Sequence, residues 1–187
     1  MRKGWTTTKL ITAGSLGVLT IALTLPASSL VAISGIPLMG GFINIFFDRT
    51  IDALALLIIG KFGAATIKKT VFGIIALPTL LLGPAGFLPK VLIYVVDGLI
   101  IDSLYFLIKD KRLAIFISNG VAAVVIAFQV VFMGRLFQIP GIEQTARIFL
   151  SPLLLIGAGL GGGISGLLGL LIYNKIKDSS LIKRIQQ

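Results

Sequence analysis

The chain has 187 residues, of which 56% are hydrophobic and 13% are charged, and its mean hydropathy is +1.04. This composition excludes an ordinary soluble domain and predicts one all-α integral membrane domain that occupies the whole chain, 1–187. Cys and His are both absent, which excludes thiol nucleophiles, imidazole bases and most transition-metal sites. We expect a protein that is not an enzyme, with no catalytic residue, no metal and no cofactor.

Six apolar segments follow one another along the chain, and each has roughly the 20 residues that a membrane-spanning helix needs. These segments cover 10–34, 37–60, 70–88, 90–108, 113–138 and 148–173. The segments predict a bundle of six transmembrane helices that crosses the membrane in multiple passes.

The basic residues predict the orientation of this bundle, because Lys and Arg favour cytoplasmic loops. With the N-terminus in the cytoplasm, thirteen of the 17 basic residues fall on the inner side. They are Arg2, Lys3, Lys9, Lys61, Lys68, Lys69, Lys109, Lys111, Arg112, Lys175, Lys177, Lys183 and Arg184. The other four, Arg49, Lys90, Arg135 and Arg147, are intramembrane or external. Both termini are therefore predicted to be cytoplasmic, and the net charge of +10 indicates contact with anionic lipid and not with nucleic acid.

Two boundaries have an alternative. Residues 1–32 combine basic, apolar and small residues in the order of a signal peptide, and its cleavage would leave five spans with an external N-terminus. The charged stretch 48–52 lies within the second predicted span. If that stretch were a loop, residues 27–47 would form a span and 53–67 would be too short to cross.

Small residues on the first and last predicted helices indicate close helix packing. Ala13 and Gly17 are four residues apart on the first helix, which places them on one face near the inner surface. The last helix contains a glycine-dense stretch, 157–166, for which we also expect close packing. Ser165 lies in this stretch, but without a His to activate it a serine-protease site is excluded.

Charged residues inside apolar spans carry the most information, because each costs about 2.5–3.5 kcal/mol at the centre of a helix on insertion scales. Asp48, Arg49 and Asp52 form such a cluster in 37–60. Arg49 and Asp52 are three residues apart and can pair along one helix face. The cluster is either a self-neutralising structural pair or one wall of a polar binding cavity. A third hypothesis, a lipid-modifying enzyme, would use Asp48 and Asp52 to bind a divalent cation.

The fourth and fifth helices carry further polar candidates. Asp97 has no basic residue within one turn of its own helix, and Tyr94 lies on the same side, which favours the cavity. Asp102 is expected to be a boundary charge that reaches Lys109 or the inner surface. On the fifth helix, the amides of Asn119 and Gln129 predict either interhelical hydrogen bonds or contacts with a ligand.

Three segments together carry a resemblance to a known family. They are Lys61-Phe62-Gly63-Ala64-Ala65-Thr66, the turn Leu82-Gly83-Pro84-Ala85-Gly86-Phe87-Leu88-Pro89-Lys90, and the helix with Asp97-Gly98 and Asp102. With six spans and cytoplasmic termini, the chain resembles the substrate-binding (S) components of energy-coupling factor (ECF) transporters. The resemblance implies a subunit of the prokaryotic cytoplasmic membrane that binds a vitamin or related micronutrient for ATP-driven uptake.

The resemblance also implies partners and roles for particular residues. A transmembrane coupling (T) subunit and two ABC ATPase subunits would supply the energy, because this chain has no nucleotide-binding loop. Tyr94, Asp97, Asn119 and Gln129 would contact a small-molecule substrate near the outer face. The coupling subunit would contact Ala13 and Gly17, where the family's Ala-x-x-x-Ala pattern has Gly in place of the second Ala. An ion-driven secondary carrier or channel is the alternative function.

Overall fold

The computed structural model describes residues 4–34, 37–79, 81–82 and 84–186, and all regular secondary structure in these residues is helical. This confirms the predicted all-α class. The helices are α1 (Thr7–Ser34), α2 (Pro37–Ile59), α3 (Ala64–Ile75), α4 (Pro89–Leu107), α5 (Lys111–Leu136), α6 (Ile142–Phe149), α7 (Pro152–Ile176) and α8 (Ser180–Gln186).

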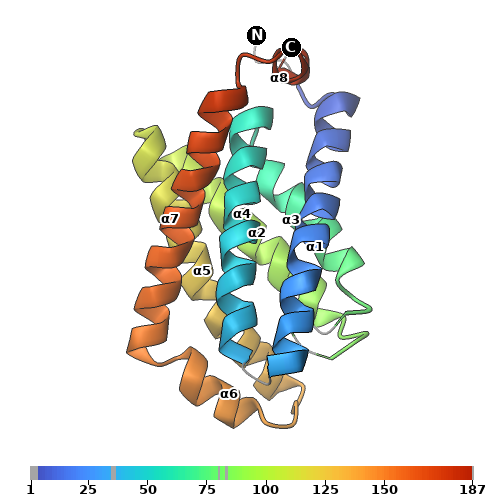
Figure 1. Ribbon diagram of the computed structural model, residues 1–187, viewed down its shortest axis with the longest axis vertical. Coiled ribbons are helices and arrows are strands. Elements are labelled where there is room, and N and C mark those ends of the chain that lie inside the picture. Colours follow the sequence, from blue (N-terminus) through green and yellow to red (C-terminus); the bar gives the residue numbers. More distant parts are fainter. Residues whose placement is uncertain (1–3, 35–36, 80, 83, 187) are drawn as a thin grey trace.

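The long helices pack side by side as a bundle (Figure 1). The start of α1 and the short helix α8 lie at one end, and α6 lies across the opposite end (Figure 1). We call these the α8 end and the α6 end. Within the bundle the later part of α2 is enclosed, since every residue from Asp48 to Ile59 is buried.

Three helices in the described part of the chain are long and apolar enough to cross a membrane: α1 over Thr7–Pro26, α5 and α7. The other two long helices, α2 and α4, are less apolar, because each contains three charged residues. With 12 residues, α3 is about 18 Å long, shorter than the ~30 Å hydrocarbon core of a bilayer. The structure thus supports a helical membrane protein.

The third predicted segment is misplaced, whereas the other five each coincide with a helix to within a few residues. We expected a helix over 70–88, but α3 ends at Ile75 and turns follow it. Leu82 and Gly86 adopt positive φ angles of 54° and 77° in these turns. The apolar content of this stretch suggested a span, but its prolines lack the backbone N–H that a continuous helix requires.

The glycine-dense stretch of α7 packs closely against α5, as predicted. Gly162 lies against both backbone and side chain of α5, because an added Cβ would lie 2.7 Å from both the Asn119 backbone oxygen and the Ala123 Cβ. Gly163 faces the Phe116 ring, and Gly166 faces the Asn119 side chain. The helices approach at the glycines because no side chain separates the two backbones.

Replacing Gly162 by Ala is expected to destabilise the protein by about 1–3 kcal/mol, because the new methyl group forces α7 away from α5. The measurement is thermal unfolding in detergent. Gly161→Ala is the matched control, since a Cβ there meets nothing within 4 Å. Equal losses of stability in the two variants would contradict close packing at Gly162.

Candidate functional site

Three charged residues of α2 are buried on its inner side. Asp48, Arg49 and Asp52 are 8%, 1% and 0% exposed. The backbone is helical throughout 48–52, so the alternative that placed a loop there is wrong. The charges consequently lie inside the bundle, where only oppositely charged side chains or hydrogen-bonding groups can offset the cost of their burial.

Two lysines of α3 supply part of this compensation, and both are 0% exposed. Lys68 Nζ lies 2.6 Å from Asp48 Oδ1 and 2.8 Å from Asp52 Oδ1. Lys69 Nζ contacts a second oxygen of Asp48, Asp52 Oδ2 at 3.1 Å and Asp97 Oδ2 at 2.8 Å. The lysines therefore tie α3 to both α2 and α4.

Arg49 of α2 and Asp97 of α4 form a bidentate ion pair. The guanidinium donates from Nη1 and Nη2 to the two carboxylate oxygens at 2.8 and 3.0 Å, in the bidentate geometry that makes such pairs strong. The predicted Arg49–Asp52 pair is confirmed, but it is longer, at 3.4 Å. The partner that Asp97 lacks on its own helix thus comes from α2.

We call Asp48, Arg49, Asp52, Lys68, Lys69 and Asp97 the charge network. With all six groups ionised its net charge is zero, and each of the six carboxylate oxygens has a cationic partner. Electroneutrality and complete pairing are what a buried ionic cluster needs to be tolerated. This pairing offsets the desolvation cost of burying Asp48, Arg49 and Asp52 on α2.

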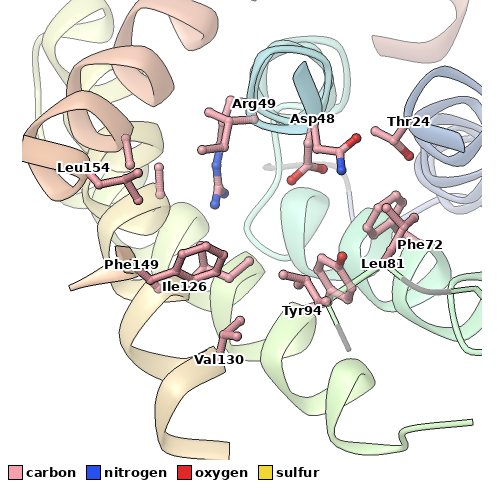
Figure 2. A pocket seen from close by; sticks show the side chains of 16 residues that line it. Thr24, Asp48, Arg49, Phe72, Leu81, Tyr94, Ile126, Val130, Phe149 and Leu154 are labelled. Atoms are coloured by element: carbon pink, nitrogen blue, oxygen red, sulfur yellow. The ribbon is translucent and has the colours of Figure 1, made fainter. Parts of the chain in front are cut away.

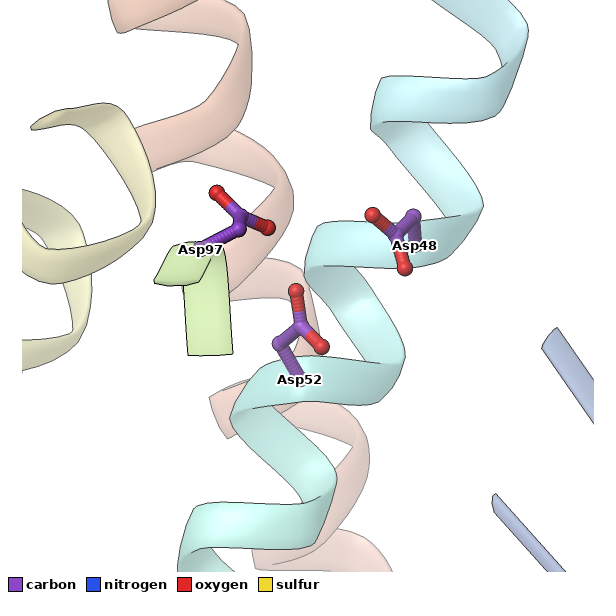
Figure 3. A group of neighbouring side chains, drawn as sticks. All are labelled: Asp48, Asp52 and Asp97. Carbon is purple, nitrogen blue, oxygen red and sulfur yellow. The ribbon is translucent and has the colours of Figure 1, made fainter. Parts of the chain in front are cut away.

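The three carboxylates of the charge network face one another across α2 and α4 (Figure 3). Their ligand atoms lie within 4.8 Å of one another, a spacing that could also hold a metal ion. All of these oxygens contact Lys or Arg, however, so the network requires no metal for charge balance.

Lys68 and Lys69 are the site residues that the sequence analysis assigned wrongly, as cytoplasmic cations. Because the third helix was placed at 70–88, the two lysines fell in the preceding loop. Charge balance is the signal that could have located them, since Arg49 alone leaves two of the three aspartates in the apolar segments without a cationic partner. Because both are buried in the bundle, they cannot count among the thirteen basic residues assigned to the cytoplasmic side.

Asp102 was expected to reach Lys109 or the inner surface, and this prediction is wrong. Its side chain caps the N-terminus of α3 instead. Its carboxylate accepts hydrogen bonds from the backbone N–H groups of Ala65 and Thr66 at 3.2 and 2.9 Å, and from the Thr66 hydroxyl at 2.6 Å. Gly98, one turn earlier, permits this approach, because a Cβ there would lie 2.6 Å from Thr66 Cα. The Asp-Gly and Asp of α4 are therefore used to position α3.

Replacing Asp102 by Ala should destabilise the protein by about 1–3 kcal/mol, since two buried backbone donors lose their acceptor. Asp102→Asn keeps one acceptor oxygen and should lose less. Thermal unfolding of both variants in one detergent makes the comparison. If Asp102→Ala unfolds at the wild-type temperature, the capping role is wrong.

A cavity of about 140 Å³ adjoins the charge network (Figure 2). Its lining comes from the later parts of α1, α3 and α5 and the early parts of α2, α4 and α7, and therefore lies toward the α6 end. The lining residues are Thr24, Asn44, Ile45, Asp48, Arg49, Phe72, Leu81, Leu82, Tyr94, Ala123, Ile126, Ala127, Val130, Phe149, Leu154 and Ala158. The cavity is mostly apolar, with a few polar groups on one side, which is typical of small-molecule sites.

Two buried polar atoms of the lining residues have no hydrogen-bond partner among the described residues: Arg49 Nε and Asn44 Oδ1. In Figure 2 the Arg49 side chain extends from α2 toward the space between Ile126 and Tyr94. The Tyr94 ring packs edge-on against Phe72, with centroids 4.6 Å apart. The cavity lining therefore combines aromatic surface with two polar residues, Arg49 and Asn44, that each have an unpartnered buried atom.

Of the four predicted substrate contacts, only Tyr94 is among the residues that line the cavity. Tyr94 lines the cavity, and Asp97 lies behind Arg49 in the charge network. Asn119 and Gln129 are not among the lining residues. The Asn119 amide donates to the Ile115 carbonyl at 2.9 Å, and the Gln129 Oε1 is buried without a partner in the described part of the chain.

Ala13 and Gly17 lie against other helices of the same chain. Ala13 is 0% exposed and packs with Ile59 and Ala64. At Gly17 an added Cβ would lie 2.7 Å from the Lys68 backbone oxygen. Because α2 and α3 already cover this face, its placement argues against the predicted contact with a separate coupling subunit.

Two contacts hold the chain around the α6 end. Arg135, at the end of α5, forms a bidentate pair with Glu143 of α6 at 2.9 Å, which lowers the pKa of the Glu143 carboxyl. Lys90, predicted to be external, is buried and donates to the Thr79 carbonyl at 2.6 Å. Thr79 and Glu143 lie in the segments that also contain Leu81, Leu82 and Phe149, which line the cavity.

Comparison with known proteins adds no relative. No family model matches the chain, and searches of curated proteins and of solved structures also found no match.

Proposed function

We propose that this protein is a membrane-embedded substrate-binding subunit, similar in role to the S components of energy-coupling factor transporters. The observation that carries the proposal is the cavity at the α6 end, which residues of seven helices line and which adjoins the charge network. A mostly apolar cavity with few polar groups suits capture of a small micronutrient, a vitamin or related compound. The chain itself performs no covalent chemistry in this proposal.

In the proposed topology the chain crosses a prokaryotic cytoplasmic membrane six times, with both termini in the cytoplasm. The third crossing consists of α3 together with the turns that follow it. The direction of the helices in Figure 1 supports this arrangement, since α1 starts and α8 lies at one end. Lys183 and Arg184 of α8 would then face anionic lipid headgroups. The cavity would lie in the outer half of the membrane.

Energy for uptake would come from separate subunits: a transmembrane coupling subunit and two ABC ATPases. The absence of a nucleotide-binding loop from this sequence supports the division of labour. The coupling contact would use an exposed helix face other than that of Ala13 and Gly17, which the bundle covers.

Affinity purification of the tagged full chain from its own membranes tests this proposal. We expect a larger membrane protein and two ATPase subunits to co-purify, and ATP-dependent uptake of the bound compound in proteoliposomes. Recovery of the chain alone from several mild detergents, without uptake in the presence of ATP, would contradict the proposal.

An ion-driven secondary carrier is the second candidate, and the charge network is the observation that favours it. Intramembrane carboxylates and lysines are the groups that proton and ion carriers use. Substrate uptake that follows an imposed proton or sodium gradient, and that needs no ATP, would support this candidate over the first.

A further inference from the structure

We propose that the ligand of the cavity is an uncharged, single-ring heterocycle with a ring carbonyl and a ring N–H, that is, a cyclic amide. This inference rests on the proposed function and narrows it to a class of substrate. It follows from the charge, the hydrogen-bonding groups and the size of the cavity.

The absence of net charge in the cavity wall favours a neutral ligand. Arg49 is the cation that lines the cavity, and both of its terminal nitrogens already donate to Asp97. Asp48, the anion of the lining, is paired with Lys68 and Lys69. A charged ligand would add a charge without a partner to a network in which every described ion is compensated, and such a buried charge is strongly disfavoured.

The two unpartnered atoms specify the polar groups of the ligand. Arg49 is 1% exposed, and its Nε–H can donate to a carbonyl oxygen. The Asn44 Oδ1 can accept from an N–H. A cyclic amide supplies both complements without carrying a charge, whereas an apolar ring would leave both buried atoms unsatisfied.

Size and aromatic surface favour one ring. The volume of about 140 Å³ is close to that of the cavities of about 150 Å³ that hold a benzene molecule. Phe72, Tyr94 and Phe149 contribute aromatic side chains to the wall. A planar ring can stack or pack edge-on against these residues.

The test uses uracil as a probe and measures its binding to the purified full chain in nanodiscs by saturation-transfer NMR. Uracil is neutral at pH 7 and has ring carbonyl and N–H groups. We expect 1,3-dimethyluracil, which lacks both N–H groups, and anionic orotate each to bind at least tenfold more weakly. 5,6-Dimethyluracil controls for size, because it has the same added methyl groups and retains both N–H groups.

Asn44→Leu should weaken uracil binding at least tenfold, since it removes the acceptor without altering the charge network. Gln129→Leu is the matched control: its buried amide oxygen is also unpartnered in the described residues, but Gln129 does not line the cavity. Uracil affinity should be unchanged in this control. Thermal unfolding establishes that both variants are folded.

Three results would overturn the inference: orotate or 1,3-dimethyluracil binding as tightly as uracil, unchanged affinity in Asn44→Leu, or no binding of uracil to the folded protein. In each case the proposed function stands if the chain co-purifies with ATPases and a small molecule. If neither ATPases nor a small molecule co-purify, the proposed function fails as well.

Discussion

Replacing Arg49 by Met is expected to destabilise the protein by about 3–5 kcal/mol, because Asp97 and the charge network then carry an uncompensated buried negative charge. The unfolding temperature in detergent should fall by roughly 6–20 °C for a chain of this size. Met fills a similar volume, so the loss of charge and hydrogen bonds accounts for most of the effect.

The double variant Arg49→Met/Asp97→Asn supplies the control. It restores electroneutrality, with two cations facing two carboxylates, and should recover a large part of the lost stability. Non-additivity of this kind is measured by a double-mutant cycle. If the single variant is as stable as wild type, or if the double variant loses the sum of the two single effects, the charge network is not the compensated unit described above.

Replacing Ala127 by Phe is expected to weaken ligand binding at least a hundredfold while leaving the protein folded. Ala127 lines the cavity and is 7% exposed, so the larger ring would occupy the ligand's space. Filling an existing cavity costs less than inserting a ring into a packed core. Binding of the compound that co-purifies with the wild-type protein is measured by isothermal titration calorimetry.

Val121→Phe provides the comparison for this variant. Val121 is on the same helix and 41% exposed on its outer surface, where an added ring meets no core. It should bind the ligand with wild-type affinity. Full-strength binding by Ala127→Phe would place the ligand elsewhere in the protein.

The helices could be predicted largely from apolar length, and the exception is instructive. α3 has 12 residues, and much of its inner side is polar because Lys68 and Lys69 point to the charge network. Apolar length therefore does not predict α3, and it favours the apolar turns that follow α3 instead. Hydropathy finds helices that face lipid; it does not find a short helix whose polar side chains are compensated inside the bundle.

The candidate site could be predicted in part. Asp48, Arg49, Asp52 and Asp97 could be singled out from the sequence, because charges inside apolar segments are rare. The partners could not be assigned, since Arg49 on α2 and Asp97 on α4 are 48 positions apart in the sequence and meet only in the folded bundle. Tyr94 lines the cavity, whereas the helix-five amides, Asn119 and Gln129, lie outside the lining.

Helix packing within the chain also explains why Ala13 and Gly17 are buried. Small residues on one face predict a close helix contact, but they do not identify the partner helix. Here the partners are α2 and α3 of the same chain. A sequence motif for close approach therefore says little about assembly until the fold is known.

The cavity at the α6 end is proposed to hold a small molecule in the cell. Native mass spectrometry of the wild-type and Ala127→Phe proteins, each gently extracted from its own membranes, tests this most directly. We expect one bound small molecule per wild-type chain and none on the variant. The same mass on both proteins, or no bound molecule on the wild type in any of several mild detergents, would show that the cavity does not hold a ligand.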